Sequence, residues 1–411
     1  MIEAVTGIFL VLMFIALYMF FIFIVLNIKN RDKLFSYPKS NRRYKVSVLI
    51  PAYNEEESIN ETIKHIMALD YPKPLLDIIV INDGSTDKTS EIVKSLIKKY
   101  SRLRLLDKKN SGKADSLNQG IKIANGELIA VVDSDSFPFP DALKKMVNYF
   151  DDEKIGAVTS FVSIRNKSQN ILTRIQSLEY LILAWTRKML DFIDSVYVTN
   201  GPLSVYRKEH LLKVGGFDSK SITEDIDITW NILDHGYKTA MCLPARVSTI
   251  APSKFKPWWR QRIRWGIGGF QVISKFKKSF FKKGIFGAFI LPYVSLSIIL
   301  GVFVFSFSFY LFLKDLFIML LTAGYYVAAE TSLFQIQSIN FYPSVMIFYF
   351  LVLFSVSMIY YNYILQKAQY EYKLGVKRFF NLVFYMFVFL TLYPVVWFAA
   401  GYRFIKGDFR W

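Results

Sequence analysis

The feature that most constrains the fold is an uncharged stretch of 25 residues near the N-terminus, Ala4–Ile28. As a helix rising about 1.5 Å per residue, it is longer than the roughly 30 Å hydrocarbon core of a bilayer. A cleaved signal peptide is the alternative, and it needs a basic leader, a short apolar region and a small-residue cleavage site. Here Glu3 precedes the stretch, and bulky residues continue to Leu26. We therefore expect an uncleaved membrane-spanning helix.

Further apolar stretches follow a polar middle region, and hydrophobic residues make up 53% of the chain. Three of these stretches are long enough to span: Gly284–Leu313, the part of Thr331–Gln366 around Val345–Tyr363, and Asn381–Tyr402. Leu316–Ala329 is shorter, which favours a re-entrant or interfacial segment. About four spanning helices are expected. The predicted divisions are an N-terminal transmembrane helix (1–28), a polar domain (29–252), an amphipathic interfacial segment (253–283) and a C-terminal membrane domain (284–411) with an interfacial segment near 366–380.

The formal net charge of +18 is concentrated in two segments. Asn27–Lys45 has seven basic residues and one acid, and Ser253–Lys283 has ten basic residues and no acid. Both lie beside expected spans, which is the positive-inside pattern and also attracts anionic membrane lipids. The distribution predicts a multi-pass protein of the cell membrane with residues 27–283 in the cytoplasm and the basic segment Lys367–Arg378 on the same side. It argues against a nucleic-acid partner.

The middle region alternates apolar strands with amphipathic helices, which predicts an α/β fold with a doubly wound, mostly parallel, Rossmann-like sheet. Expected strands are Val46–Ile50, Ile78–Ile81, Leu103–Leu106 and Leu128–Val132, and expected helices are Glu56–Leu69, Asp87–Tyr100, Lys113–Ala124 and Glu224–Leu233. Ligands of such sheets bind beyond the carboxyl ends of the strands. Three strands run directly into polar clusters there: Pro51–Glu55, Asn82–Ser85 and Asp133–Asp135.

Asp133 and Asp135 are two residues apart on an extended segment, so their carboxylates point to the same side. A divalent cation would relieve their repulsion, and oxygen ligands suit Mg²⁺ or Mn²⁺. Paired aspartates in a turn or helix cap are the alternative, and the pattern alone leaves both open.

Two other polar positions follow the strands. Asp83 precedes Gly84 and is placed to accept hydrogen bonds from a base or ribose, or to form an ordinary Asx turn. Lys113 follows Gly112 at the start of a helix, where free amides and an ammonium attract phosphate. A solvated surface lysine fits the same residues.

Two more motifs lie towards the C-terminus. Asp225, after Glu224 at the start of a helix, would serve as a general base if burial raised its pKa, but an N-cap cluster also fits. Gln261, Arg264 and Trp265 fall within one helical turn of the basic segment. Such aromatic and basic residues are typical of a membrane interface, although an arginine would also stabilise a departing diphosphate.

The order of the motifs resembles that of the processive, inverting family-two glycosyltransferases over about Tyr44–Gln271. The matching segments are Pro-Ala-Tyr-Asn-Glu-Glu, Asn-Asp-Gly-Ser-Thr-Asp, Gly-Lys-Ala-Asp-Ser-Leu-Asn, Asp-Ser-Asp, Ile-Thr-Glu-Asp-Ile-Asp and Gln-Arg-Ile-Arg-Trp. This group includes poly-β-1,6-N-acetylglucosamine synthases, hyaluronan synthases, chitin-synthase-like enzymes and cellulose synthase. The resemblance implies a cytoplasmic GT-A catalytic domain between transmembrane helices, and polymerisation of a β-linked polysaccharide from a UDP-sugar with passage of the chain across the membrane.

The resemblance also implies a role for each matching residue. Nucleotide-sugar binding falls to Pro51, Ala52, Tyr53, Asn54, Glu55, Asp83, Lys113, Asp133, Ser134 and Asp135. Asp133 and Asp135 would also hold the metal, with Asp135 as the direct ligand. Asp225 would deprotonate the acceptor hydroxyl, with support from Glu224. Diphosphate and acceptor binding falls to Gly201, Pro202, Ser204, Gln261, Arg262, Arg264 and Trp265.

Ile222–Trp230 and Arg260–Gly269 look closest to the poly-N-acetylglucosamine synthases, which favours UDP-N-acetylglucosamine. Relatives often have two helices before the catalytic domain, whereas this chain has one, and an accessory membrane subunit is compatible with this difference. Transfer of a single sugar to a polyprenyl phosphate or another lipid is the alternative enzyme function. A transporter or a nucleotide-sugar sensor would not need Asp225 beside a metal pair.

Overall fold

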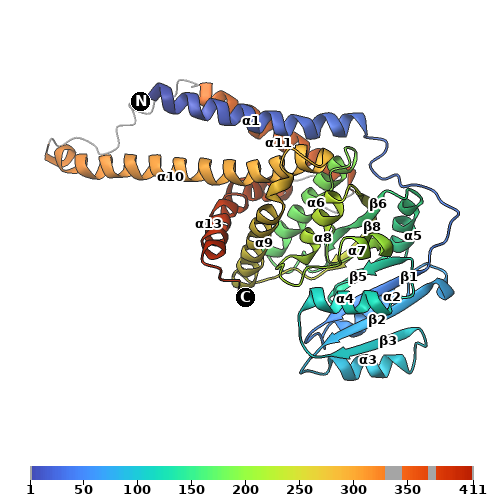
Figure 1. Ribbon diagram of the computed structural model, residues 1–411. Coiled ribbons are helices and arrows are strands. Elements are labelled where there is room, and N and C mark those ends of the chain that lie inside the picture. Colours follow the sequence, from blue (N-terminus) through green and yellow to red (C-terminus); the bar gives the residue numbers. More distant parts are fainter. Residues whose placement is uncertain (1, 329–344, 369–375, 410–411) are drawn as a thin grey trace. The chain divides into compact units, whose positions relative to one another are not determined.

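The fold comes from a computed structural model that describes residues 2–328, 345–368 and 376–409. By its internal contacts the chain divides into two compact units (Figure 1). One unit combines Met1–Val25 with Leu296–Phe398, and the other combines Leu26–Ser295 with Ala399–Trp411. The second unit contains the α/β domain and every predicted site residue.

The described part of the α/β domain contains one eight-stranded sheet with the order β3-β2-β1-β4-β7-β6-β8-β5. Its strands are β1 (Val46–Ala52), β2 (Leu76–Asp83), β3 (Leu103–Lys108), β4 (Leu128–Val131), β5 (Ser136–Pro138), β6 (Ile155–Ile164), β7 (Ser204–Arg207) and β8 (Lys238–Thr249). Its helices are α2 (Ile59–Met67), α3 (Thr89–Ile97), α4 (Lys113–Ile123), α5 (Ala142–Val147), α6 (Ile171–Asp191), α7 (Lys208–Lys213), α8 (Glu224–Asp234) and α9 (Phe255–Phe276).

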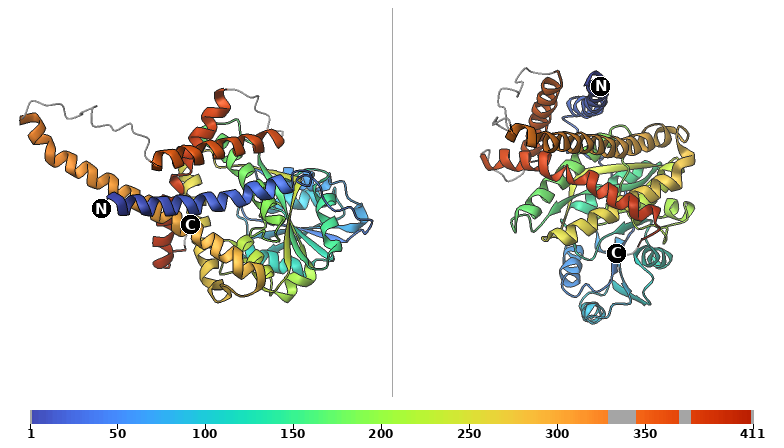
Figure 2. Two further views of the ribbon diagram at one scale, coloured as in Figure 1. Left: turned by 90° about the horizontal axis from the view of Figure 1, so that it is seen from above. Right: turned by 90° about the vertical axis from the view of Figure 1, so that its left-hand side faces the viewer.

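The predicted parallel half of the sheet is confirmed: β2 pairs in parallel with both β1 and β3, and β1 pairs in parallel with β4. Strands buried on both faces read as continuous apolar runs, which is why the sequence revealed them. Successive residues of β1 face opposite sides, and two apolar cores result. Helices α2, α3 and α5 contribute to one core, while α4, α7 and α8 contribute to the other. Figure 2 shows the sheet with helices around it from two further directions.

The prediction of a mostly parallel sheet is confirmed, because four of the seven pairings between the described strands are parallel, and the antiparallel pairings all lie in the other half of the sheet. Strand β7 is antiparallel to both β4 and β6, and β5 is antiparallel to β8, whereas β6 and β8 are parallel. The sheet is therefore mixed. Strands β5 and β7 are only three and four residues long, too short for a recognisable periodic pattern.

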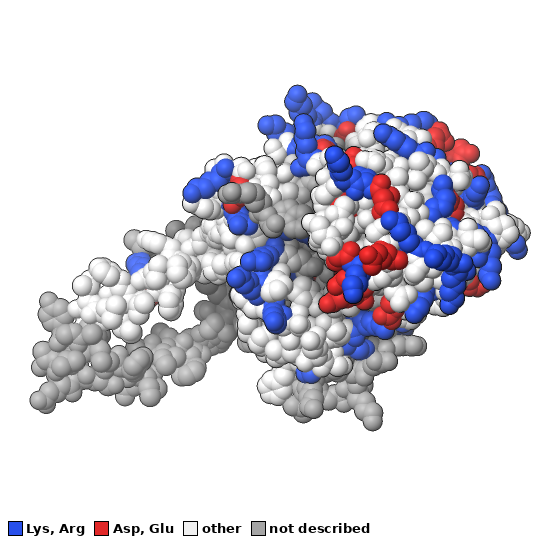
Figure 3. All heavy atoms as spheres, turned by 90° about the horizontal axis from the view of Figure 1, so that it is seen from below, with Lys and Arg blue, Asp and Glu red and all other residues white. Residues whose placement is uncertain are grey.

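The apolar helices are α1 (Ile2–Lys29), α10 (Leu291–Ala328), α11 (Val345–Lys367), α12 (Val376–Phe384) and α13 (Leu392–Ile405). Among the described residues, three helical spans are long and apolar enough to cross a membrane: Gly7–Lys29, Phe286–Thr322 and Phe379–Ile405. Figure 3 shows charged side chains crowded on the α/β domain and almost none on the described part of the long helix.

Three of the four expected spans therefore have a matching helix. The fourth, around Val345–Tyr363, forms α11, which is not among the candidate spans; the start of the longer stretch, 331–344, lies outside the described residues. The segment expected to be re-entrant continues α10 without a break to Ala328, and Ala329 lies outside the described residues. The central part of the basic segment Lys367–Arg378, residues 369–375, also lies outside them.

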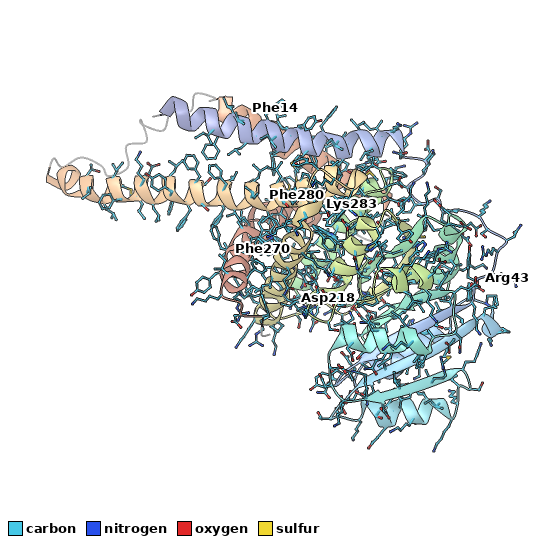
Figure 4. The ribbon with its side chains drawn as sticks, in the orientation of Figure 1. Phe14, Arg43, Asp218, Phe270, Phe280 and Lys283 are labelled. Carbon is cyan, nitrogen blue, oxygen red and sulfur yellow. The ribbon has the colours of Figure 1, made fainter. Side chains whose placement is uncertain are left out.

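Helix α9 packs into the α/β domain, although the sequence favoured an interfacial segment here. The Arg262 guanidinium is fully buried and donates to the Glu179 carboxylate on α6 at 2.5 Å. Lys275 binds Asp218, labelled in Figure 4, and Asp227, each at 2.8 Å. One face of α9 thus belongs to the domain core.

Removal of the Glu179 carboxylate leaves Arg262 charged, buried and unpaired, which typically costs about 3–5 kcal/mol. We expect Glu179→Ala to lower the thermal unfolding midpoint of the detergent-purified protein. Glu179→Leu combined with Arg262→Met removes both charges and should restore much of the loss.

The control is Lys144→Ala, because the pair of Lys144 with Asp70 is exposed and such pairs contribute about 0–1 kcal/mol. If Glu179→Ala unfolds at the same temperature as Lys144→Ala, the buried pair does not hold α9 in place.

Candidate active site

The loops that follow β1 and β2 are tied together at the carboxyl end of the sheet. Asn54 has a φ of 54°, a left-handed conformation that asparagine tolerates better than most residues. Its amide N–H donates to Ser85 Oγ at 3.0 Å, and its Oδ1 accepts from the Thr86 N–H at 2.8 Å. These bonds leave the neighbouring Tyr53 ring half exposed at the surface.

The residues around this loop are mostly internal. Pro51 and Ala52 end β1 and are buried. The Glu55 carboxylate accepts from Ser58 Oγ at 2.6 Å. Ser134 is buried, and its carbonyl accepts from Thr62 Oγ1 at 2.7 Å. The segment therefore fixes backbone positions at the edge of the sheet.

Asp83 organises the turn that leads into α4. Its carboxylate accepts the backbone N–H groups of Ser111 and Gly112 at 2.9 and 2.8 Å and pairs with Lys108. Gly112 has a φ of 91°, which is costly for residues with a Cβ, and it places Lys113 as the first residue of α4. A contact between Asp83 and a bound nucleotide remains a prediction. In the structure, the buried Asp83 carboxylate holds the loop that leads to Lys113.

Lys113 joins two carboxylates from different elements. Its Nζ lies 2.6 Å from Asp133 Oδ1, after β4, and 2.6 Å from Glu224 Oε1, at the start of α8. A Cβ added to Gly201 would lie 2.6 Å from Asp133 Oδ2 and 3.1 Å from Lys113 Nζ. Only glycine therefore lets the loop before β7 approach this ion pair so closely.

The pKa values of Glu224 and of the predicted general base Asp225 are shifted in opposite directions. Burial alone would raise the pKa of the Glu224 carboxyl, but the Lys113 ammonium outweighs burial and lowers it. Burial raises the pKa of Asp225 to about 6, helped by the negative charges of Glu224 and Asp133. Glu224 thus stays ionised, while Asp225 can exchange a proton near neutral pH.

The Asp135 carboxylate lies in an acidic and largely buried environment. Burial and the nearby carboxylates of Asp133 and Glu55 raise its pKa to about 6. Among the described residues, no group of three or more Asp, Glu, His or Cys side chains could hold a metal by itself. The aspartate pair would need ligands from a bound substrate, and Mg²⁺ is commonly held by one or two carboxylates with phosphates.

The loop before β7 was predicted to form an acceptor pocket from Gly201, Pro202 and Ser204. Gly201 approaches the Lys113 ion pair as described above, and Pro202 is partly exposed. The Ser204 hydroxyl is completely buried and donates to the Asn200 carbonyl at 2.7 Å. Ser204 therefore shapes the loop instead of facing a ligand.

The α9 motif separates into buried and accessible residues. Arg262 is fully buried against Glu179, so the structure does not support its predicted contact with diphosphate or acceptor. The guanidinium of Arg262 stacks on the Trp265 ring, with its central carbon 4.0 Å from the ring centroid, and holds that ring in place. Gln261 Oε1 accepts from Arg262 Nη1 at 2.9 Å. Arg264 is partly exposed and interacts electrostatically with Glu224.

A second connection ties α9 to the predicted base. Gln271 Oε1 accepts the Ile222 N–H at 3.0 Å, just before α8 begins. A Cβ added to Gly268 would lie 2.0 Å from Thr223 Oγ1, so the two segments are in close contact. The helix that carries Trp265 therefore also positions Asp225.

Sequence reasoning missed α6, which contributes Glu179, Tyr180 and Arg187. The Tyr180 and Trp265 ring centroids are 6.3 Å apart. Arg187 interacts electrostatically with Asp225. The sequence did contain one indication of a buried ion pair. Glu179 is the only charged residue between Ile175 and Thr186, and an acid in such an apolar stretch is usually paired.

The chain is similar in sequence and in fold to known glycosyltransferases. Residues 47–215 match the family described as Glycosyl transferase family 2. The chain is 36% identical over 247 residues to a probable glycosyltransferase, YdaM, of Bacillus subtilis, with 58% of each protein covered. It is 34% identical over 262 residues to poly-beta-1,6-N-acetyl-D-glucosamine synthase of Staphylococcus aureus, with 63% of each covered. The chain thus matches about six tenths of the length of these relatives.

Among solved structures, the chain is similar to a mannosyltransferase from Pyrobaculum calidifontis in complex with GDP-Man and Mn²⁺. The TM-score is 0.57 at 18% identity, and the match covers 98% of this chain and 99% of the other. At this identity the likeness concerns the fold, which is GT-A. Residues 47–215 thus match a glycosyl transferase family 2 domain, and the fold is GT-A.

Proposed function

We propose that this chain is a membrane-bound, processive, inverting glycosyltransferase that polymerises a β-linked polysaccharide from a UDP-sugar. The observation that carries the proposal is the placement of Asp225 beside Glu224, which Lys113 joins to Asp133. This arrangement supports Asp225 as a proton acceptor close to Asp133, which with Asp135 is suited to a cation and a diphosphate. The similarity to the staphylococcal synthase supports UDP-N-acetylglucosamine as the donor.

In the proposed reaction, Asp225 accepts the proton of the acceptor hydroxyl while the hydroxyl oxygen attacks C1 of the donor sugar. The bond between C1 and the diphosphate oxygen breaks, and the configuration at C1 inverts. Arg264 lies on the side of Glu224, where a guanidinium would stabilise the departing diphosphate. Asp133 and Asp135 would hold Mg²⁺ or Mn²⁺, which neutralises charge on the leaving group when bound.

The proposed location is the cell membrane, with several spans and a cytoplasmic catalytic domain. The three candidate helices and the basic segments beside two of them support this orientation. The growing chain would leave through the membrane helices.

The first experiment determines donor and product together. Purified full-length protein in lipid is given radiolabelled UDP-sugars one at a time, and the products are sized. A ladder of long, alkali-stable chains from UDP-N-acetylglucosamine is the expected result. A lipid carrying one sugar as the sole product would favour the alternative of single transfer, and no product with any nucleotide-sugar would contradict the proposal.

Asp225→Asn should reduce transfer by about 10²–10⁴-fold, the usual contribution of a general base. The variant should still bind UDP-sugar, because the amide keeps the size of the side chain. Turnover and donor affinity are measured on the same preparation. Near-normal turnover would exclude Asp225 as the base.

The raised pKa of Asp225 predicts an acid limb in the rate profile. The carboxylate accepts a proton only when ionised, so the rate should fall as pH drops through about 6. Asp135 titrates in the same range, so the metal must be kept saturating to separate the two effects. A flat profile from pH 5 to 8 would contradict this assignment.

Asp135→Ala should abolish the dependence of UDP binding on Mn²⁺, as measured by calorimetry with and without chelator. Asp141→Ala is the control, since this half-exposed carboxylate pairs with Lys145 away from the sheet edge. Wild-type activity that persists in excess chelator would remove the cation from the proposal.

A further inference from the structure

Helix α6 presents an arginine to the proposed base without an evident structural reason. The Nε–H of Arg187 is buried and has no hydrogen-bond partner among the described residues. A buried donor left unpaired typically costs about 1–3 kcal/mol, so its retention needs an explanation. Two other arginines lie in this region. The Nε of Arg262 is also unpartnered among the described residues, but its Nη2 donates to Glu179, and Arg264 interacts electrostatically with Glu224.

The surroundings of Arg187 point to a ligand. Arg187 interacts electrostatically with the Asp225 carboxylate and with the Tyr197 and Tyr180 side chains. Tyr180 lies seven residues before Arg187, so the two share a face of α6 about two turns apart. Tyr180 in turn contacts the Trp265 ring. Trp265, Tyr180 and Arg187 therefore form a row of aromatic and guanidinium groups that leads towards Asp225.

The charges decide which class of ligand fits. Arg187 interacts with Asp225, whose carboxylate has, among the described residues, no ion-pair partner as close as the one Lys113 gives Glu224, and it would repel a lipid phosphate placed beside it. A neutral sugar meets no such repulsion. Its hydroxyl and ring oxygens accept hydrogen bonds from a guanidinium, and its C–H faces pack against aromatic rings.

We propose that Arg187 binds the acceptor sugar through an oxygen near the attacking hydroxyl, in a subsite that continues along Tyr180 towards Trp265. This inference rests on the proposed function, because it takes Asp225 as the base. It adds that the acceptor next to the base is a neutral carbohydrate and not a phosphate.

The test uses full-length protein in lipid, with UDP-N-acetylglucosamine as donor and a β-linked N-acetylglucosamine oligosaccharide as acceptor. Arg187→Met should raise the acceptor KM at least tenfold, while equilibrium dialysis shows unchanged UDP affinity. Arg187→Lys should recover part of the acceptor affinity. The retained UDP affinity reports that the variant is folded.

Arg174→Met is the matched control. Arg174 is also on α6 and also has a buried, unpartnered Nε, but it lies more than three turns from Arg187. This variant should keep the wild-type acceptor KM. An equal rise in both variants would make the effect a general one of α6 packing and would overturn the inference.

Other outcomes separate the inference from the function on which it rests. An acceptor KM that Arg187→Met leaves unchanged would overturn the inference alone. If Arg187→Met weakens transfer to polyprenyl phosphate but not to the oligosaccharide, the ligand of Arg187 is a phosphate and not a sugar, and the inference is wrong. Failure of the wild type to transfer sugar to either acceptor would instead contradict the proposed function.

Discussion

Acidic side chains from separate elements gather at one edge of this sheet, and the Lys113 ammonium makes that arrangement tolerable. It lies 2.6 Å from carboxylate oxygens of both Asp133 and Glu224, which would otherwise repel each other and Asp225. The lysine depends in turn on Asp83, which holds the turn before α4 through two backbone amides. The buried Asp83 carboxylate thus places the Lys113 ammonium, and the ammonium holds the carboxylates of the proposed site. Without it, the base and the proposed metal site could not be adjacent.

The parallel half of the fold was predictable because its strands are buried on both faces and read as apolar runs. The edge where the polar clusters meet followed from that half, so Asp133, Asp135 and Lys113 were placed together correctly. The mixed half was not predicted: β5 and β7 are too short to show a period, and the longer β6 and β8 were not recognised as strands. The roles of individual residues in the site remain proposals.

Where prediction failed within the site, the reason is three-dimensional pairing. Arg262 looks like its neighbour Arg264 in the sequence, and only the distant Glu179 makes it a core residue. Ser204 likewise looks accessible in a loop motif but is bonded internally. Arg187 has no motif around it, and only its electrostatic interaction with Asp225 in the folded chain draws attention to it. Long-range partners such as these are not encoded in local spacing.

The dependence of the base on α9 has a consequence for how the protein is made. Gln271 holds the Ile222 amide, yet it follows Glu224 by 47 positions. At translation rates of about 5–20 residues per second, roughly 2–9 s separate synthesis of these two positions. During that interval β8 and α9 are still being made, so the nascent chain has its acidic residues but lacks the helix that holds the proposed base. Catalytic competence is therefore acquired late in synthesis, after the N-terminal apolar helix has left the ribosome.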